Sequence, residues 1–456
     1  MSDLLARSGG PSYDEILDTD TRPVNPVLRL AAVDDIGPVT IPAGRYTSQA
    51  IFDAEVEHLW KRTWQMACRE EHIPNVGDAY VYDVVGLSIL VLRVTPTRIK
   101  AYWNACLHRG RALATERGPV GDVIRCAFHG LEWHHDGTLA QLTTSWDFPH
   151  VQADRFCLPE VTVGIWEGWV FVNPDPDARP FEEHLGTLPE HFAKWAPGDK
   201  YVSAHVGKVL PVNWKVAQEA FMEAMHVIAT HPQIMASIGD ANTRYDAFGP
   251  FSRAISAGAV ASPHLTWTPT EQQIFDSLTD RRLDADPVAV VPEGMTARAF
   301  AAESGRRRKT RTVPDIDTYC DAEMVDSIYY TLYPNFHPWG AFNRINYRFR
   351  PVGRQVDRCL MECIYTDDFA GERPPPAPYV ELGLDAEWVD AVPELGLLAR
   401  VFQQDTLNLP AVQRGLEAMA ARGGSLTLSR YQELKVRHFH HLWEQQVPTV
   451  STATHP

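Results

Sequence analysis

Four residues in the first third of the chain have the types and spacing of metal ligands. Cys106 and His108 are separated by one residue, Cys126 and His129 by two, and seventeen residues lie between the pairs. Zinc motifs usually pair like ligands, and ordinary iron–sulfur clusters bind four thiolates. Two cysteines and two histidines instead fit a [2Fe–2S] cluster with cysteine on one iron and histidine on the other. A structural zinc site and a pair of buried core cysteines are the alternatives.

The residues around these four carry a family resemblance. Gly110 and Gly130 each lie beside a candidate histidine ligand, where glycine allows the backbone to turn closely. The series C-x-H-R-G, C-x-x-H-G and a downstream D-G resembles the Rieske domain of ring-hydroxylating oxygenase alpha subunits. One position departs, because the aromatic residue that usually follows the second H-G is Leu131 here, with Trp133 two places on. This difference concerns packing beside the cluster and leaves the ligand set intact.

A second candidate metal pair, His226 and His231, lies in the stretch NWKVAQEAFMEAMHVIATHPQ. Five residues apart on a helix, the two side chains would lie near one face, and a break at Ala229–Thr230 would let both reach one ion. Glu223, three residues before His226, would share that face. The stretch resembles the N-W-K, E-x-F, E/D-x-x-H-x-x-x-x-H segment of the same alpha subunits. There the two histidines bind a mononuclear non-haem iron, whereas an isolated pair is usually an ordinary core or surface pair.

The resemblance also implies a carboxylate ligand on a C-terminal helix, a few residues before a Q-R/K-G-L sequence. This chain has Gln403-Gln404-Asp405 followed by QRGL, so Asp405 is the predicted third ligand and Glu417 the alternative. Two histidines and one carboxylate form a facial triad, which leaves positions open on Fe(II) for O2. The ordinary interpretation of Asp405 is a solvated helix acid.

Glu223 is the predicted catalytic residue. In the family, the equivalent acid joins a histidine of the mononuclear site to a Rieske histidine on the neighbouring subunit, and the expected partner here is His129. That route implies a closed head-to-tail ring, most simply a homotrimer. Relatives that dioxygenate arenes often carry Asn where this chain has Ala220, and more often Asp at the position of Glu223. These departures argue against aromatic cis-dihydroxylation.

The resemblance implies a terminal oxygenase component that receives electrons from a ferredoxin or a flavin reductase. With O2 at a mononuclear Fe(II), it would mono- or dioxygenate an apolar organic substrate, aromatic or alicyclic. An oxidative N- or O-demethylase of the same family is one alternative, and a Rieske electron carrier without oxygenase activity is another. A separate beta subunit is a further candidate partner.

The composition limits the classes of partner and the cellular compartment that we expect for this protein. The chain has 456 residues, 45% hydrophobic and 22% charged, with a net charge of -16. This balance disfavours nucleic acid and anionic membranes as partners. Seven cysteines with no disulfide framework, no signal peptide pattern and only short apolar runs lead us to expect a cytoplasmic protein. The basic run Arg306–Lys309 is predicted to lie in a solvated loop.

The periodicity of the chain predicts an α+β protein in three parts. Residues 1–45 form an arm that lies on another surface, such as a neighbouring subunit. Residues 46–180 form an all-β Rieske domain, and residues 181–456 form a catalytic domain whose antiparallel sheet is flanked by helices in a helix-grip or START-like arrangement. Residues 235–325 are predicted to be long loops that form a lid or entrance wall. Strands are predicted at 79–85, 87–94, 98–103, 164–172, 203–212, 327–333, 342–350 and 358–365, and helices at 48–64, 182–195, 394–407 (with a break at Pro410) and 429–445.

Overall fold

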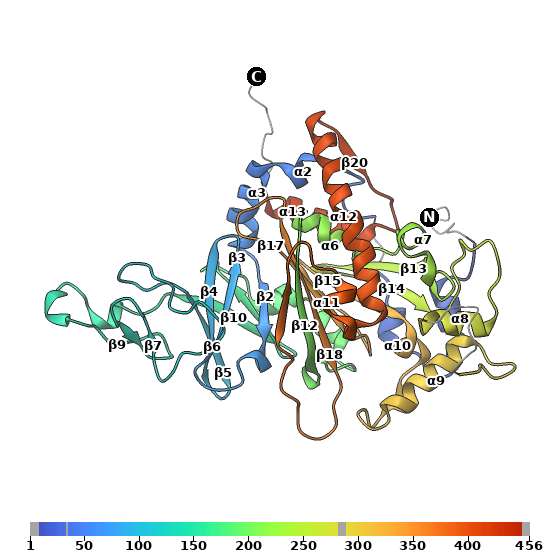
Figure 1. The fold of residues 1–456 in the computed structure, drawn as a ribbon, viewed down its shortest axis with the longest axis horizontal. Helices are drawn as coiled ribbons and strands as arrows, with labels where there is room; N and C mark the ends of the chain where they lie inside the picture. Colours follow the sequence, from blue (N-terminus) through green and yellow to red (C-terminus); the bar gives the residue numbers. More distant parts are fainter. Residues whose placement is uncertain (1–8, 33–34, 281–288, 449–456) are drawn as a thin grey trace.

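The computed structural model describes residues 9–32, 35–280 and 289–448, which form two β-sheet domains (Figure 1). The first holds a seven-stranded sheet in which neighbouring strands run antiparallel. Its predicted strands 79–85, 87–94 and 98–103 are confirmed with small shifts at their ends. The order is β2 (Gln65–Arg69), β11 (Trp169–Asn173), β10 (Glu160–Trp166), β5 (Arg98–Trp103), β4 (Leu87–Thr95), β3 (Asp78–Val84) and β6 (Gly118–Pro119).

A small three-stranded sheet extends from this domain. It consists of β7 (Ile124–Arg125), β8 (Glu132–Trp133) and β9 (Leu139–Gln141). Figure 1 shows it at one end of the molecule, far from the C-terminal helices. Between the two sheets lies a hydrophobic core that includes Tyr102, Leu131 and Trp133. Leu131 and Trp133 are both buried there. Leu131, which stands where the family motif usually has an aromatic residue, therefore packs in the core beside the cysteine and histidine loops.

The catalytic domain is built on an eight-stranded sheet. Its strands pair antiparallel, except for the parallel pair β12 and β19. The helices α6 (Trp214–Glu219) and α13 (Leu434–Gln446) contact this sheet, and α12 (Leu397–Ala421) contacts α6. The predicted α+β class is therefore confirmed. The order is β13 (Ile238–Phe248), β14 (Phe251–Gly258), β15 (Ser327–Leu332), β16 (Phe336–Pro338), β17 (Ile345–Pro351), β18 (Cys359–Asp367), β12 (Tyr201–Leu210) and β19 (Tyr379–Leu382).

The two domains are joined by buried polar contacts. Arg348 on β17 donates from Nη1 to the carbonyl oxygen of Met66 on β2 at 2.7 Å. Its Nη2 donates to Glu362 at 2.6 Å, and both side chains are almost fully buried. A buried arginine requires such a partner, so the ion pair and the backbone bonds together hold the two sheets in one relative position.

The prediction of long loops over residues 235–325 was wrong. This region holds the hairpin of β13 and β14 and the helices α8 (Glu271–Leu278), α9 (Ala297–Lys309) and α10 (Asp321–Val325). The basic run lies in the last turn of α9 and not in a loop. Its first residue, Arg306, is buried and pairs with Asp321. Residues 281–288 lie outside the described residues.

The predicted break at Pro410 was also wrong, because α12, which is 25 residues long, continues through it. A proline inside a helix costs about 3 kcal/mol. The helix buries one continuous face before and after Pro410, which includes Phe402, Leu409 and Leu416, and this burial offsets the cost. The predicted helix 182–195 is divided into α4 (Phe181–Leu185) and α5 (Leu188–Phe192).

The described part of the N-terminal arm lies on the catalytic domain of its own chain, and contact with a neighbouring subunit stays a prediction. Tyr13 donates to Asp326 at 2.8 Å, and Arg298 pairs with Asp20 at 3.0 Å. The short strand β1 (Thr40–Pro42) pairs with β20 (Ser425–Thr427) near the C-terminus. Within the described residues, the helices are too short or too polar to cross a bilayer.

Candidate metal centres

The first candidate centre is formed by two loops with the same backbone design. One follows β5 and carries Cys106, and the other joins β7 to β8 and carries Cys126. In each loop the cysteine carbonyl accepts from the glycine four residues on, at 2.9 Å for Gly110 and 3.0 Å for Gly130. Both glycines have φ of 73°, which L side chains rarely adopt. The predicted need for glycine at these turns is therefore confirmed.

The two loops bring all four candidate cluster ligands together. Cys106 and Cys126 are buried, and their thiols lie within hydrogen-bond reach of each other. The rings of His108 and His129 have centroids 4.5 Å apart. Nδ1 of His108 is buried and has no hydrogen-bond partner among the described residues, so an imidazole nitrogen and two thiols are available at one place. This donor set fits a [2Fe–2S] cluster.

Electrostatics and exposure distinguish the inner and outer parts of this centre. Burial raises the pKa of the Cys126 thiol, but hydrogen bonds from the backbone N–H of Phe128, the Cys106 thiol and the backbone N–H of His129 outweigh it and lower the pKa. The shift favours the thiolate, the form that binds metals. His129 is half-buried, and the centroid of the Phe128 ring, which is 53% exposed, lies 3.8 Å from the centroid of its ring. The histidine side of this centre therefore faces outward.

The second candidate centre begins at the end of α6. The chain turns after Glu219 and forms the single-turn helix α7 (Val227–Thr230), with His226 just before it and His231 just after it. At His231 the backbone leaves the helical conformation (φ -126°, ψ 49°), directly after the predicted break. The two rings consequently come to 5.1 Å between centroids.

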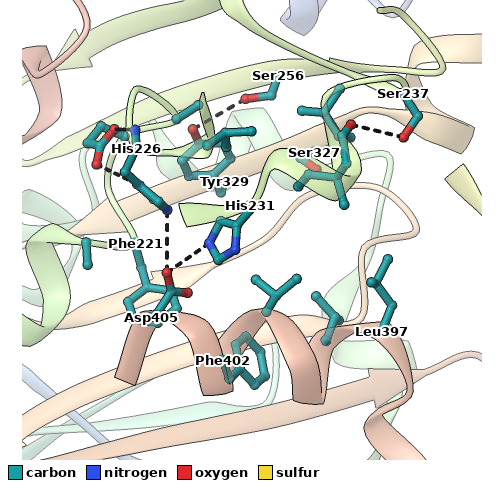
Figure 2. Close-up of a pocket in the computed structure, with 18 of the residues that line it drawn as sticks. Phe221, His226, His231, Ser237, Ser256, Ser327, Tyr329, Leu397, Phe402 and Asp405 are labelled. Atoms are coloured by element: carbon teal, nitrogen blue, oxygen red, sulfur yellow. Dashed lines mark hydrogen bonds and ion pairs between the residues drawn. The ribbon is translucent and has the colours of Figure 1, made fainter. Parts of the chain in front are cut away.

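Asp405 on α12 completes this centre, as Figure 2 shows. Its Oδ1 lies 2.9 Å from Nε2 of His231 and 3.6 Å from Nε2 of His226. Ligand atoms of the three residues all lie within 4.8 Å of one another. Glu417, the alternative ligand, is exposed and lies roughly 18 Å further along α12, where it accepts from Gln413. The structure therefore brings Asp405 to the histidines and leaves Glu417 away from them.

The other ring nitrogens of both histidines are held by acceptors. Nδ1 of His226 lies 2.6 Å from Glu223 Oε1, and Nδ1 of His231 lies 2.8 Å from Gln404 Oε1. With a carboxylate and an amide oxygen as acceptors, each Nδ1 can carry the ring proton, which leaves the lone pair of each Nε2 available to a metal. Two lone pairs and a carboxylate oxygen then point at one another, which fits a cation between them. Sequence reasoning gave Gln404 no role, although it directly precedes Asp405.

Two cavities adjoin the triad, and Glu223 lines both. The inner cavity has a volume of about 240 Å³ and mainly apolar walls, which include Phe221, Val401 and Phe402. The outer cavity, of about 740 Å³, is lined by Glu223 and by residues of α6 and α12, which include Glu219. Burial raises the pKa of Glu219 to about 8.

An all-β domain with two cysteine–histidine loops, joined to a sheet-and-helix domain with a two-histidine, one-carboxylate triad, defines the Rieske non-haem iron oxygenase class. Comparison with known families agrees with this assignment. Residues 63–150 match the Rieske [2Fe-2S] domain, and residues 192–449 match the ring hydroxylating alpha subunit (catalytic domain). The chain belongs to this family of alpha subunits, and membership implies a Rieske cluster and a mononuclear iron.

Individual relatives are more distant. The carnitine monooxygenase oxygenase subunit of Escherichia coli (strain K12) is 29% identical over 201 residues, which is 44% of this chain and 54% of that protein. The biphenyl 2,3-dioxygenase subunit alpha of Rhodococcus jostii (strain RHA1) is 25% identical over 190 residues, 41% of each chain. The matches thus span about half the length of these relatives.

Solved structures share the fold over nearly the whole chain. A quaternary ammonium Rieske monooxygenase with a bound inhibitor aligns with a TM-score of 0.65 at 19% identity, covering 91% of this chain and 97% of the other. Naphthalene 1,2-dioxygenase with bound indole aligns with a TM-score of 0.63 at 15% identity, covering 92% and 94%. At this identity the likeness concerns the fold alone.

Proposed function

We propose that this chain is the terminal oxygenase component of a Rieske oxygenase system. The observation that carries the proposal is the convergence of His226, His231 and Asp405 beside an apolar cavity, in a chain that also carries the two cysteine–histidine loops. The cluster would be held by Cys106, His108, Cys126 and His129. When bound at the triad, the iron supplies activation of O2, which consumes the electrons that the cluster delivers.

The surrounding side chains prepare the triad for that chemistry. Glu223 and Gln404 fix the tautomer and orientation of the two histidines, so that both Nε2 atoms face the ion. Apolar side chains from α12 wall the adjoining cavity, which keeps bulk water from the reacting centre and accommodates an apolar substrate. The proposed reaction is hydroxylation of a small organic molecule.

Oxidative demethylation is the second candidate, because the same site could hydroxylate a methyl carbon that then leaves as formaldehyde. Ala220 lines the cavity and Glu223 adjoins it, at the two positions where the motif departs from arene dioxygenases. The relatives include a monooxygenase named for carnitine, which is not an arene. A ferredoxin or a flavin reductase is the proposed electron donor for either reaction.

We further propose a head-to-tail homotrimer in which Glu223 joins His226 to His129 of the partner subunit. Figure 1 places the β7–β9 tip and α7 at opposite ends of one chain, so the two centres of a single chain are far apart. Exposed apolar residues lie on both surfaces that would meet in this contact. Phe128 and Trp146 (80% exposed) lie at or near the Rieske tip, and Met225, Ile228, Leu407 and Val412 lie near the triad. Glu223 lines the outer cavity, where a partner's tip could reach it.

The proposal is tested by the fate of labelled O2. The purified protein is supplied with a reductase, labelled O2 and a panel of small apolar substrates, and the products are examined by mass spectrometry. We expect at least one product that carries the label. Reduction and reoxidation of the cluster without labelled product from any substrate would contradict the proposal and favour the electron-carrier alternative.

A further inference from the structure

The inner cavity beside the triad is small. Its volume of about 240 Å³ exceeds the roughly 150 Å³ of an apolar protein cavity that binds benzene, so a body of about one to two rings fits. One wall of the cavity comes from α12, through Leu397, Leu398, Val401 and Phe402. A substrate of this site is therefore held mostly by contact with apolar and aromatic side chains.

The charged groups that line this cavity already have partners. Glu223 accepts from Nδ1 and from the backbone N–H of His226, at 2.6 Å and 3.0 Å. Asp405 lies against His231 and His226 as part of the proposed iron site. No lysine or arginine of the described residues lines the cavity. An anionic group on a substrate would consequently enter without a counter-ion, which is strongly unfavourable in a buried site, and a cationic group would meet two carboxylates that are already engaged by the histidines.

A buried cation behind the wall does not change this conclusion. Lys435 lies 4.3 Å from the centroid of the Tyr329 ring and donates to the carbonyl oxygen of Tyr329 at 3.2 Å. It does not line the cavity, because Tyr329 does so in its place. Burial lowers the pKa of Lys435 well below its usual value, which disfavours a charge at this position.

The cavity does contain a group of hydroxyls. Ser256 and Ser327 are paired directly across β14 and β15, and Tyr329 follows Ser327 by two residues on the same face. Ser256 Oγ lies 3.4 Å from the Tyr329 hydroxyl, whereas the Ser327 hydroxyl has no hydrogen-bond partner among the described residues. A second pair, Ser237 and Ser277, is joined at 2.9 Å. Figure 2 shows Ser237, Ser256 and Ser327 on the wall away from Asp405.

Resting on the proposed oxygenase function, we propose that the substrate is uncharged and carries one hydrogen-bonding group on an apolar body of one or two rings. The apolar body lies against α12, and an alcohol, ether or carbonyl group reaches Ser327 at the opposite wall. A free hydroxyl can donate to or accept from such a group, whereas it cannot neutralise a carboxylate or an ammonium.

The test uses four ligands that share one skeleton and differ in charge, together with L-carnitine, a zwitterion of a different skeleton. Binding of 2-phenylethanol, ethylbenzene, phenylacetate, 2-phenylethylammonium and L-carnitine to the iron-loaded protein is measured by calorimetry without O2, so that no turnover is needed. We expect the alcohol to bind at least roughly tenfold more tightly than any of the three charged ligands. Equal or tighter binding of phenylacetate, 2-phenylethylammonium or L-carnitine would overturn the proposal.

Two variants test the role of the hydroxyl wall. Ser327→Ala should weaken binding of 2-phenylethanol about fivefold and leave ethylbenzene unchanged, because only the alcohol loses a hydrogen bond. The matched control is Ser252→Ala, since Ser252 is buried on the same strand as Ser256 but does not line the cavity. Equal losses for both ligands, or for both variants, would contradict a polar contact at Ser327.

Different results would contradict the uncharged substrate and the proposed oxygenase function. A protein that makes labelled product but prefers an anionic or cationic substrate overturns the uncharged substrate and leaves the oxygenase function in place. A protein that binds the neutral alcohol best but never incorporates label overturns the oxygenase function, although the cavity retains the proposed preference.

Discussion

The two metal centres differ in how far along the chain their ligands are collected. The proposed cluster site would take its four side chains from residues 106–129, on two loops whose shape is set by backbone hydrogen bonds and glycine turns. The triad takes two histidines from one segment and Asp405 from a helix about 170 residues later, and it depends on side-chain supports. A loop site can therefore be complete in a local motif, whereas the triad exists only once the catalytic domain has folded.

The largest expected effect is at Asp405, whose loss should remove one metal centre and leave the other in place. Asp405→Ala removes the carboxylate of the triad, so we expect the mononuclear iron and product formation to fall below detection. The absorption spectrum of the cluster should remain, because its loops lie far from α12 of the same chain. Glu417→Ala is the control on the same helix and should keep both metals. An Asp405→Ala protein that retains full iron and activity would show that another carboxylate binds the metal.

The next largest effect concerns the link between the centres. Glu223→Gln keeps an acceptor for Nδ1 of His226, so both metals and the trimer should be retained. We expect turnover to fall roughly 100-fold, since an amide cannot replace the bridging carboxylate. In a single turnover, the reduced cluster should stay reduced after O2 and substrate are added. Cluster oxidation at the wild-type rate would show that Glu223 is not the bridge.

A smaller effect is expected at the second support of the triad. Gln404→Leu removes the acceptor for His231 Nδ1 and should weaken iron binding about tenfold, as measured by competition with a chelator. Gln404→Glu restores an acceptor oxygen and should recover most of the affinity. If the leucine and glutamate variants bind iron equally well, Gln404 does not orient His231.

The smallest effect should appear in the cluster loops. Gly110 has φ of 73°, and a Cβ there would meet no atom within 4 Å, so Gly110→Ala should lower the unfolding free energy by about 1 kcal/mol through backbone strain alone. Gly415→Ala, in the exposed interior of α12, should have the opposite sign. Denaturant unfolding, followed by cluster absorbance and circular dichroism, measures both. Stabilisation by Gly110→Ala would show that the turn does not need glycine.

The sequence predicted what depends on local spacing. The cysteine–histidine pairs, the hairpin strands from β3 to β5 and the close approach of His226 to His231 all follow from residues near one another in the chain. The helix α12 was predicted to break at Pro410 because helix propensity is local, whereas the buried face that carries the helix past this residue is tertiary.

The region 235–325 was missed for a similar reason. Strand β13 buries polar residues with little alternation, so it has no ordinary strand pattern. Their partners come from the N-terminal segment: Asn242 donates to the Pro11 carbonyl, and Asp246 accepts from the backbone N–H of Ala32 at 3.2 Å. These contacts join residues more than 200 positions apart, which no local pattern can predict.

The most direct test of two separate centres in one chain is the metal content of the purified protein. Iron, zinc and acid-labile sulfide are measured per chain in the wild type and in Asp405→Ala. We predict about three irons and two sulfides in the wild type, and about two irons with two sulfides in the variant, because only the mononuclear iron depends on Asp405. Stoichiometric zinc without labile sulfide, or equal iron in both proteins, would contradict the account.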